Sequence, residues 1–465
     1  MLATAPRPRS HRGDPSRRAP CRHTPPFNKV RAPLVACLLL SVTACSGQPH
    51  ETQHAVHWHD PIEVATGPAY RGPWRMNESQ FLLVDDSSIA ITENGTTVVI
   101  YGNLEERDIF LQIYDPTGTP RHETPVNISH SPNVFSWLPR VVVEEPDASR
   151  IYVLWQEIVF SGGSHGGEIF FARSIDGGKT FSPPINLSNT TAGAGKGRQS
   201  RHQWHNGSLD IVRGHGGLLY AAWTEFEGPL WLARSDDDGA TFSSPALIAG
   251  GGSDLPGRGP SLALSGESVV YLAWTVGEDS SANIRLAVSQ DQGLSFEPYR
   301  EVHPGPGLAD APKIAVCADG VVHLVYGETR GGRRAVFYAR STDGGRTFEE
   351  RRTLSGNARA GFPSLAVSEN QDVVVTWELF PGRGPRSRGL GYAVSRDGGA
   401  TFSSPAEVPG TADAEGGTNG SQQGLLMRKL AMNESGALAV VNSTFRAGDV
   451  SRVLLLRGVL PGDEP

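Results

Sequence analysis

The sequence has little cysteine, little helical periodicity and no long apolar run. Only four cysteines occur in 465 residues, which excludes a disulfide-rich scaffold. No long stretch repeats apolar residues at the 3.6-residue period, which excludes a helical bundle. By contrast, glycine (55) and proline (34) are frequent and hydrophobic residues make up only 38%. This balance is typical of many short strands joined by tight turns.

Several common site motifs are also absent. The sequence contains no Walker loop, zinc-ligand spacing, nucleophile elbow or dinucleotide fingerprint, so we expect neither a metal nor a cofactor. Residues 1–44 carry eight Lys or Arg and one Asp, which leaves 34 basic and 48 acidic side chains in the remainder, a formal charge of −14. Such an acidic body argues against nucleic-acid binding. An anionic ligand would need a local cluster of arginines.

The N-terminal region has the features of an export signal. Residues 34–44 form an apolar run after Lys29 and Arg31; the run is too short to span a bilayer and has the length of a signal-peptide core. It ends in Val42-Thr43-Ala44-Cys45, which resembles the bacterial lipobox. That resemblance implies an acylated Cys45 and a lipoprotein of the cell envelope, at the outer membrane in a Gram-negative host. A plain secretory signal, and a later translation start such as Val30, are the alternatives.

Residues 46–79 are expected to be a flexible tether. Its histidines and one aspartate are better explained by a linker than by a loose metal site; they are His50, His54, His57, His59 and Asp60. After removal of the leader only Cys45 and Cys317 remain, so acylation of Cys45 leaves no disulfide. Cys317 lies in an apolar run and is predicted to be a small core residue.

A motif of eight residues occurs five times. The motif reads Ser-x-Asp-x-Gly-x-Thr/Ser-Phe, and its copies are residues 174–181, 235–242, 289–296, 341–348 and 395–402. Within such a turn the Asp side chain accepts hydrogen bonds from backbone N–H groups, and the Gly supplies a positive φ. The pattern therefore predicts stabilised hairpin turns with structural roles for Asp176, Asp237, Asp291, Asp343 and Asp397.

Each motif is preceded by three short apolar stretches, such as residues 260–264, 269–274 and 283–288, and a fourth begins at its Phe. Four antiparallel strands in about 50 residues are typical of a propeller blade. Residues 88–118 and 428–456 form two further units that lack the full motif. The last unit lacks a fourth strand, which residues 80–84 are expected to supply, closing the ring. We predict an all-β propeller over residues 80–458 with seven blades, six being the alternative, and a tail over 459–465.

The five motifs resemble the Asp-box, or BNR, repeats of sialidases and related secreted propellers. This resemblance implies the propeller fold and, for function, exo-α-sialidase-type glycan hydrolysis or glycan binding. The sialidase Arg-Ile-Pro motif is missing, although residues 138–141 hold related letters in another order, and sialidases usually have six blades. Because fold does not fix function, a non-catalytic propeller scaffold at the cell envelope is the alternative.

The strand ends suggest a binding site at one mouth of the channel. Acidic residues follow the second strand of each unit, and basic or aromatic residues precede the first. Arg140, Arg258 and Arg359 are candidates to grip a carboxylate, with Tyr326 and Glu328 as a nucleophile pair. The expected partners are a glycan ligand and a membrane reached through the lipid anchor, with no nucleic acid; the oligomeric state stays open. The tryptophans beside these acids are predicted to pack between blades; they are Trp155, Trp223, Trp274 and Trp377.

Overall fold

The computed structural model describes residues 56–462, except 132, 160–166, 201, 303–304, 306, 383–385 and 413–425. All of these residues belong to one compact unit, Thr52–Pro465. The predicted signal segment, Cys45, His50 and His54 lie outside the described residues. Among the described residues, no helix has the length and apolar character needed to cross a membrane.

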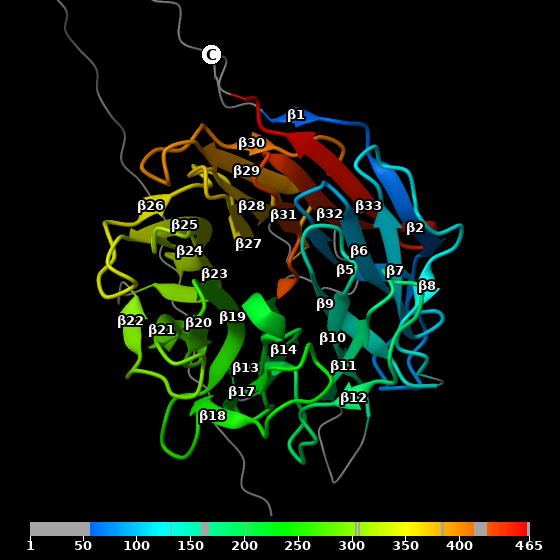
Figure 1. The fold of residues 1–465 in the computed structure, drawn as a ribbon, viewed down its shortest axis with the longest axis horizontal. Coiled ribbons are helices and arrows are strands. Elements are labelled where there is room, and N and C mark those ends of the chain that lie inside the picture. Colours follow the sequence, from blue (N-terminus) through cyan, green and yellow to red (C-terminus); the bar gives the residue numbers. More distant parts are fainter. Residues whose placement is uncertain are drawn as a thin grey trace, which may run out of the picture. The chain divides into compact units, whose positions relative to one another are not determined.

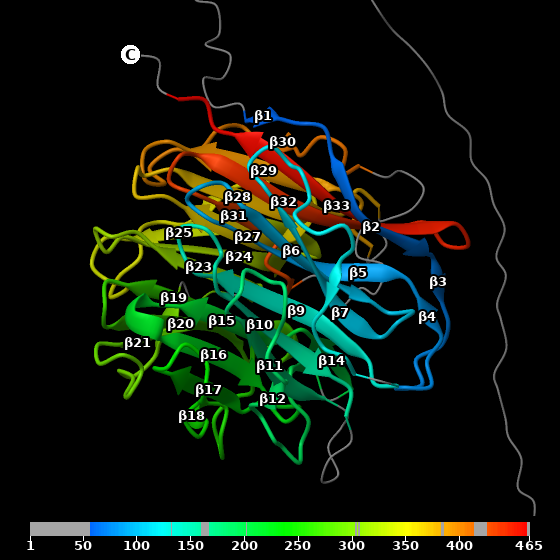
Figure 2. The ribbon, with the colours of Figure 1, turned by 45° about the vertical axis from the view of Figure 1, so that its right-hand side comes forward.

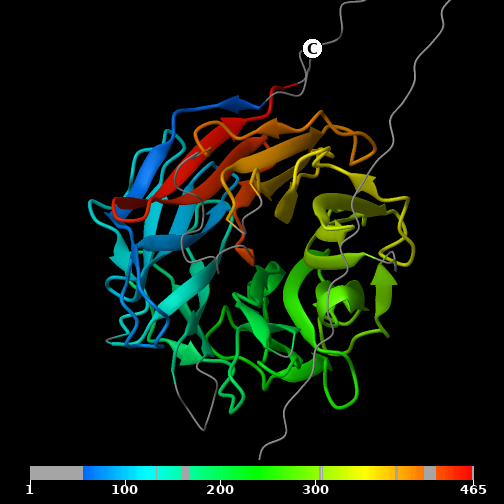
Figure 3. The same cartoon turned by 180° about the vertical axis from the view of Figure 1, so that it is seen from behind.

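The described chain is an all-β propeller of seven blades around one axis (Figures 1 and 3). In each of blades 1–6 the first strand lies next to the axis and the fourth lies at the rim. Neighbouring strands pair antiparallel throughout. The described chain includes two short 3-10 turns, His215–Gly217 and Asp279–Ser281. The seven-blade prediction is confirmed.

The strands of the first six blades are as follows. Blade 1 contains β5 (Val84–Ile91), β6 (Thr97–Asn103), β7 (Asp108–Tyr114) and β8 (Val126–Asn127). Blade 2 contains β9 (Ser136–Val143), β10 (Ile151–Glu157), β11 (Glu168–Ser174) and β12 (Ile185–Asn186). Blade 3 contains β15 (Leu209–Arg213), β16 (Leu219–Thr224), β17 (Leu230–Ser235) and β18 (Ala246–Ala249). Blade 4 contains β19 (Gly257–Ser265), β20 (Val269–Val276), β21 (Asn283–Ser289) and β22 (Arg300–Val302). Blade 5 contains β23 (Leu308–Val316), β24 (Val322–Arg330), β25 (Arg333–Ser341) and β26 (Arg352–Thr353). Blade 6 contains β27 (Ala360–Val367), β28 (Val373–Leu379), β29 (Leu390–Ser395) and β30 (Ala406–Glu407).

Blade 7 joins the two ends of the described chain. Its β31 (Leu430–Met432), β32 (Ala437–Phe445) and β33 (Val450–Val459) come from the C-terminal part. The rim strands β1 (His57–Trp58) and β2 (Ile62–Pro68) come from the N-terminal part and both pair with β33 (Figure 2). Residues 80–84 do not close the ring, so that prediction was wrong: β4 (Phe81–Leu82) pairs with β3 (Tyr70–Arg71) instead.

The alternation of apolar and polar side chains along β2 explains why this strand closes the ring. Ile62 and Val64 face the sheet and join the apolar cluster between blades 7 and 1, whereas Glu63 is exposed. Pairing with β33 therefore buries an apolar face and covers an open sheet edge at once. The propeller consequently begins at residue 57, before the boundary at residue 80 that the sequence suggested, and residues 57–68 are strands rather than a tether.

Apolar clusters between neighbouring blades form the core. The four tryptophans predicted to pack there are all buried: Trp155, Trp223, Trp274 and Trp377. Trp223 of blade 3, for example, shares a cluster with Tyr152 and Phe171 of blade 2. Burying a large aromatic side chain stabilises the fold by several kcal/mol, roughly 3–5 kcal/mol as judged by truncation to alanine. These residues thus fix the spacing of the blades.

Each Asp-box turn follows the hydrogen-bond pattern expected from its sequence. In the turn of blade 5, Asp343 Oδ1 accepts from the Ser341 hydroxyl at 2.8 Å and the Thr347 N–H at 2.9 Å. Its Oδ2 accepts from the Thr347 hydroxyl at 2.7 Å. Gly345 lies at φ +80°, where a Cβ atom would stand 2.8 Å from Leu286 of blade 4. The turn therefore needs glycine both for its backbone and for its close approach to the preceding blade.

The aromatic residue that ends each box reaches the preceding blade. Phe402 of blade 6 packs edge-on against Tyr338 of blade 5 with ring centroids 4.7 Å apart. Phe242 of blade 3 meets Phe171 of blade 2 in the same way at 4.8 Å. The Asp boxes thus connect neighbouring blades as well as forming turns within a blade.

The Asp boxes should make stability depend on acid pH. Hydrogen bonds to Thr180 lower the pKa of Asp176 to about 2, and hydrogen bonds to Thr241 lower that of Asp237 to about 2. A carboxyl whose folded pKa is depressed stabilises the fold above its unfolded pKa, near 3.9, and loses that contribution as the pH falls toward the folded value. We expect the melting temperature to fall between about pH 4 and pH 2.

Asp237→Asn should flatten this acid dependence and lower the melting temperature at neutral pH. The matched control is Asp236→Asn in the same turn, because the exposed Asp236 carboxylate pairs with Arg234 at 3.6 Å and not with the groups of Thr241 that bind Asp237. Thermal melts from pH 2 to pH 7 measure both effects. An Asp237→Asn profile identical to that of the wild type would contradict a structural role for the box.

Candidate functional site

The irregular parts of this repeat protein gather on one face. Asp boxes connect the third and fourth strands of a blade, so the connections from a fourth strand to the next first strand lie at the opposite end. We call this end the loop face. Two of its connections are elaborated: residues 69–83 with β3 and β4, and residues 187–208 with β13 (Lys196–Ser200) and β14 (Gln203–Asn206). The connection from β30 to β31 is described at residues 408–412 and 426–429. Elaborated connections on a rigid scaffold commonly carry function.

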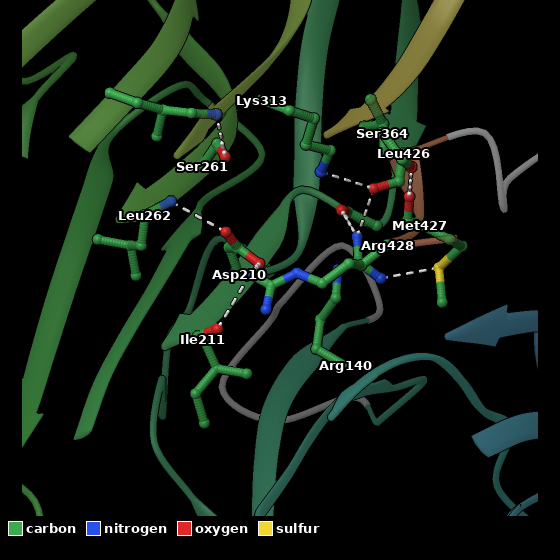
Figure 4. A network of polar contacts seen from close by, with 12 residues as sticks. Arg140, Asp210, Ile211, Ser261, Leu262, Lys313, Ser364, Leu426, Met427 and Arg428 are labelled. Atoms are coloured by element: carbon green, nitrogen blue, oxygen red, sulfur yellow. Dashed lines mark hydrogen bonds and ion pairs between the residues drawn. The ribbon is translucent and has the colours of Figure 1, made fainter. Parts of the chain in front are cut away.

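Arg140, one of the predicted ligand-binding residues, lies on β9 beside the axis and is fully buried. Its guanidinium donates to the carbonyl oxygens of Gly207 at 2.9 Å and Leu426 at 3.0 Å, and to Met427 Sδ at 2.7 Å (Figure 4). Burial lowers the pKa of Arg140 to about 10. The side chain therefore holds the segment 426–429 in place.

The axis itself is occupied by this segment. Lys313 Nζ of β23 donates to Leu426 O at 3.1 Å, and burial lowers the pKa of Lys313 to about 7. Arg428 pairs with Asp210 of β15 at 3.0 Å, and Lys429 pairs with Glu378 of β28. Figure 4 shows that Arg140, Lys313 and Asp210 approach the segment from separate strands. This arrangement is not predictable from the sequence, because its contacts join blades that are far apart in the chain.

Arg258 of blade 4 lies at the base of the β13–β14 hairpin. It begins β19, is buried, and donates through Nη1 to the carbonyl oxygens of Gly277 and Arg198. Burial lowers its pKa. Gly197 of the hairpin touches the Arg258 side chain, since a Cβ there would lie 2.6 Å from Arg258 Cβ. The connection 187–208 thus contacts two of the predicted arginines, Arg140 through Gly207 and Arg258 through the hairpin.

Arg359 lies apart from them, in the connection between blades 5 and 6. It is exposed and donates to the carbonyl oxygen of Gly382. Within the part of the chain that the structure describes, neither Arg140, Arg258 nor Arg359 pairs with a carboxylate. Carbonyl oxygens neutralise no charge, so Arg258 and Arg359 keep their positive charge for another partner, whereas Arg140 is enclosed by the segment 426–429.

Tyr326 and Glu328 lie on the same face of β24 and are brought together by Arg351. Arg351 donates to Tyr326 Oη at 3.4 Å and forms an ion pair with Glu328. The two side chains are only 1% and 3% exposed, and burial raises the pKa of Tyr326. Arg351, just before β26, was not predicted from the sequence. The three side chains form a closed polar cluster within blade 5.

The remaining candidates have simple environments. His57, His59 and Asp60 are exposed, and no three metal-binding side chains cluster in the described parts of the chain. Cys317 is buried, as predicted for a core residue, and burial raises the pKa of its thiol to about 12. The thiol lies 3.4 Å from His323 Nε2, but a thiol with such a pKa is a poor nucleophile at neutral pH.

Comparisons with known proteins support the fold. A family model described as "BNR repeat-like domain" matches residues 119–375. No protein with a curated description matches. An ulvan lyase of polysaccharide lyase family PL25, bound to -[GlcA(1-4)Rha3S]-, is similar at 13% identity over 87% of this chain and 98% of its own, with a TM-score of 0.56.

Two further structures are similar. The polysaccharide lyase Uly1 gives a TM-score of 0.53 at 12% identity, over 87% of this chain and 99% of its own. The Hadza microbial sialidase Hz136 gives a TM-score of 0.43 at 17% identity, over 80% of this chain and 65% of its own. At these identities the likeness describes the fold alone.

Proposed function

The chain belongs to the BNR repeat-like domain family, and on that basis we propose that it recognises an acidic glycan on the loop face. One observation carries the proposal: in a body with a formal charge of −14, the connection 69–83, the β13–β14 hairpin and the guanidinium groups of Arg258 and Arg359, which pair with no carboxylate among the described residues, lie on this single face. Local positive charge on an acidic body favours an anionic ligand at that place and disfavours it elsewhere.

The chemistry of the site fits a carboxylate or sulfate on a sugar. Arginine presents a planar set of donors that matches such oxyanions in a two-point geometry. Arg258 uses only Nη1 in its hydrogen bonds to described residues, which leaves Nη2 and Nε for a ligand. The similar ulvan lyase is bound to a glucuronate-containing, sulfated sugar, a ligand of this chemical class.

The geometry best supports glycan binding without hydrolysis by Tyr326. Sialidase-type hydrolysis would require Tyr326 to reach the sugar, whereas Tyr326 and Glu328 are buried and held by Arg351. The second candidate, a non-catalytic scaffold that binds a protein, is favoured by the occupation of the axis by Leu426 and Met427. Acylation of Cys45 would keep either activity at the cell envelope.

A binding screen of the purified full-length chain separates these functions. The probes are ulvan oligosaccharides, oligogalacturonate, sulfated chondroitin oligosaccharides and sialyllactose, with cellopentaose as the neutral control. Calorimetry should show binding to at least one acidic probe and none to cellopentaose. The same mixtures are assayed for released sialic acid, new reducing ends and unsaturated uronate. Absence of binding to every acidic probe would contradict the proposal and favour the scaffold.

Arg258→Ala should weaken binding of the acidic probe at least about tenfold, since a charge-assisted hydrogen bond contributes roughly 1.5–3 kcal/mol. Arg258→Lys should restore little, because an ammonium group lacks the planar donor set. The matched control is Arg300→Ala on the same blade, where Arg300 pairs with Glu297 beside the Asp box. Thermal melts of each variant show whether the fold is retained. Wild-type affinity in a folded Arg258→Ala variant would exclude Arg258 from the site.

A further inference from the structure

An exposed tryptophan stands on the loop face with its ring held in a fixed plane. Trp74, in the connection 69–83, is 42% exposed. Its ring stacks on that of Trp137, with centroids 5.1 Å apart and an interplanar angle of 9°. Trp137 is the second residue of β9, the inner strand of blade 2, and is itself buried. The buried ring therefore orients the exposed one before any ligand arrives.

The surroundings of Trp74 are aromatic and basic. Phe81 and Phe135 flank it with centroids at 5.7 and 6.1 Å. The Arg107 guanidinium lies 5.0 Å from the Phe135 ring centroid, a cation–π distance. Arg107 also donates to Asn133 O at 3.4 Å and makes no ion pair with any residue the structure describes. The Arg107 guanidinium, which makes no ion pair with a described residue, thus lies against the Phe135 ring, which in turn flanks Trp74.

This cluster is continuous with the site on the axis. Phe81, Phe135 and Trp137 belong to the same apolar cluster as Met427, whose sulfur accepts from Arg140. A chain of sugars bound at the arginines of the loop face has Trp74 on the same face, over blades 1 and 2.

We propose that Trp74 is a stacking platform for one sugar ring of the acidic glycan, and that Arg107 holds the carboxylate or sulfate of that ring or of its neighbour. The inference rests on the proposed function. A pyranose ring presents a face of C–H groups that packs on the flat indole, while its polar groups point outward to solvent and to Arg107. The rigid stack on Trp137 reduces the ordering cost of binding.

Tyr299 provides a matched control. It is also 42% exposed, but it follows the Asp box of blade 4, and Arg285 lies over its ring at 3.8 Å from the centroid. Tyr299 is therefore an exposed aromatic of equal accessibility at the opposite end of a blade. A general effect of removing exposed aromatic surface will appear in both Trp74 and Tyr299 variants.

The experiment measures the affinity of full-length variants for ulvan oligosaccharides and oligogalacturonate by calorimetry. We expect Trp74→Ala to weaken binding at least tenfold, Trp74→Phe two- to fourfold, and Tyr299→Ala not at all. Arg107→Ala should weaken binding at least fivefold, with Arg107→Lys recovering part of the loss. Thermal melts report folding, and Trp74→Phe retains a ring where Trp74→Ala destabilises the cluster.

The outcomes separate the two proposals. A wild-type protein that binds no acidic probe would overturn the proposed function and this inference together. If the wild-type protein binds an acidic probe and both Trp74→Ala and Trp74→Phe bind it with wild-type affinity, the stacking platform alone would be overturned. Equal losses in Trp74→Ala and Tyr299→Ala would also overturn it, since the effect would then not be local to the loop face.

Discussion

Replacing Lys429 by methionine is expected to lower the free energy of unfolding by roughly 3–5 kcal/mol, the usual cost of removing one partner of a buried ion pair. Lys429 is 4% exposed and its partner Glu378 is not exposed at all. The substitution removes the cation and leaves the buried carboxylate of Glu378 without its lysine. Urea denaturation of the full-length chain measures the change.

Two variants control this experiment. Lys179→Met, in an exposed Asp-box turn, should change stability by less than about 0.5 kcal/mol, as is usual for surface substitutions. The double variant Lys429→Met with Glu378→Leu should recover much of the loss, because both charges are then absent from the interior. A loss below 1 kcal/mol for Lys429→Met alone would contradict the view that this pair anchors the axial segment.

Removing β1 and β2 is expected to have a still larger effect. A chain that starts at Tyr70 should be less stable than one that starts at Val56 by at least about 4 kcal/mol, since burial of each aliphatic side chain contributes roughly 1.5–3 kcal/mol. Ile62 and Val64 of β2 lie in the cluster between blades 7 and 1, and β2 pairs with β33 from Ile62 to Pro68. Urea denaturation compares the two chains directly.

The shorter chain should also self-associate, because an uncovered β33 presents unpaired backbone groups to other chains. Size-exclusion chromatography at several concentrations detects this. If both chains unfold at the same urea concentration and stay monodisperse, β2 contributes nothing to closure, and residues up to 79 would behave as the tether expected from the sequence.

The sequence was sufficient for the repeating unit because the contacts that define it are local. The Asp343 carboxylate, for example, binds groups only two and four residues away, so the residues of the motif are sufficient to specify the turn. Repetition of that turn after three apolar strands then gives the blade, whereas the number of blades stayed open between seven and six. Closure was not specified, because residues 62–68 and 80–84 both carry apolar side chains, and only burial against β33, nearly 400 positions later, selects the first.

For the candidate site, the order of the strands places Arg258 and Arg359 at the ends where the first strands of their blades begin, whereas Arg140 lies within β9. The sequence did not determine which side chains are accessible. Arg351 closes over Tyr326 and Glu328 from the strand connection that follows β25, and Leu426 reaches Arg140 from 286 positions away. Accessibility depends on which charged or carbonyl partner the ring brings within hydrogen-bond distance. Only the closed tertiary structure decides that, because those partners come from different blades.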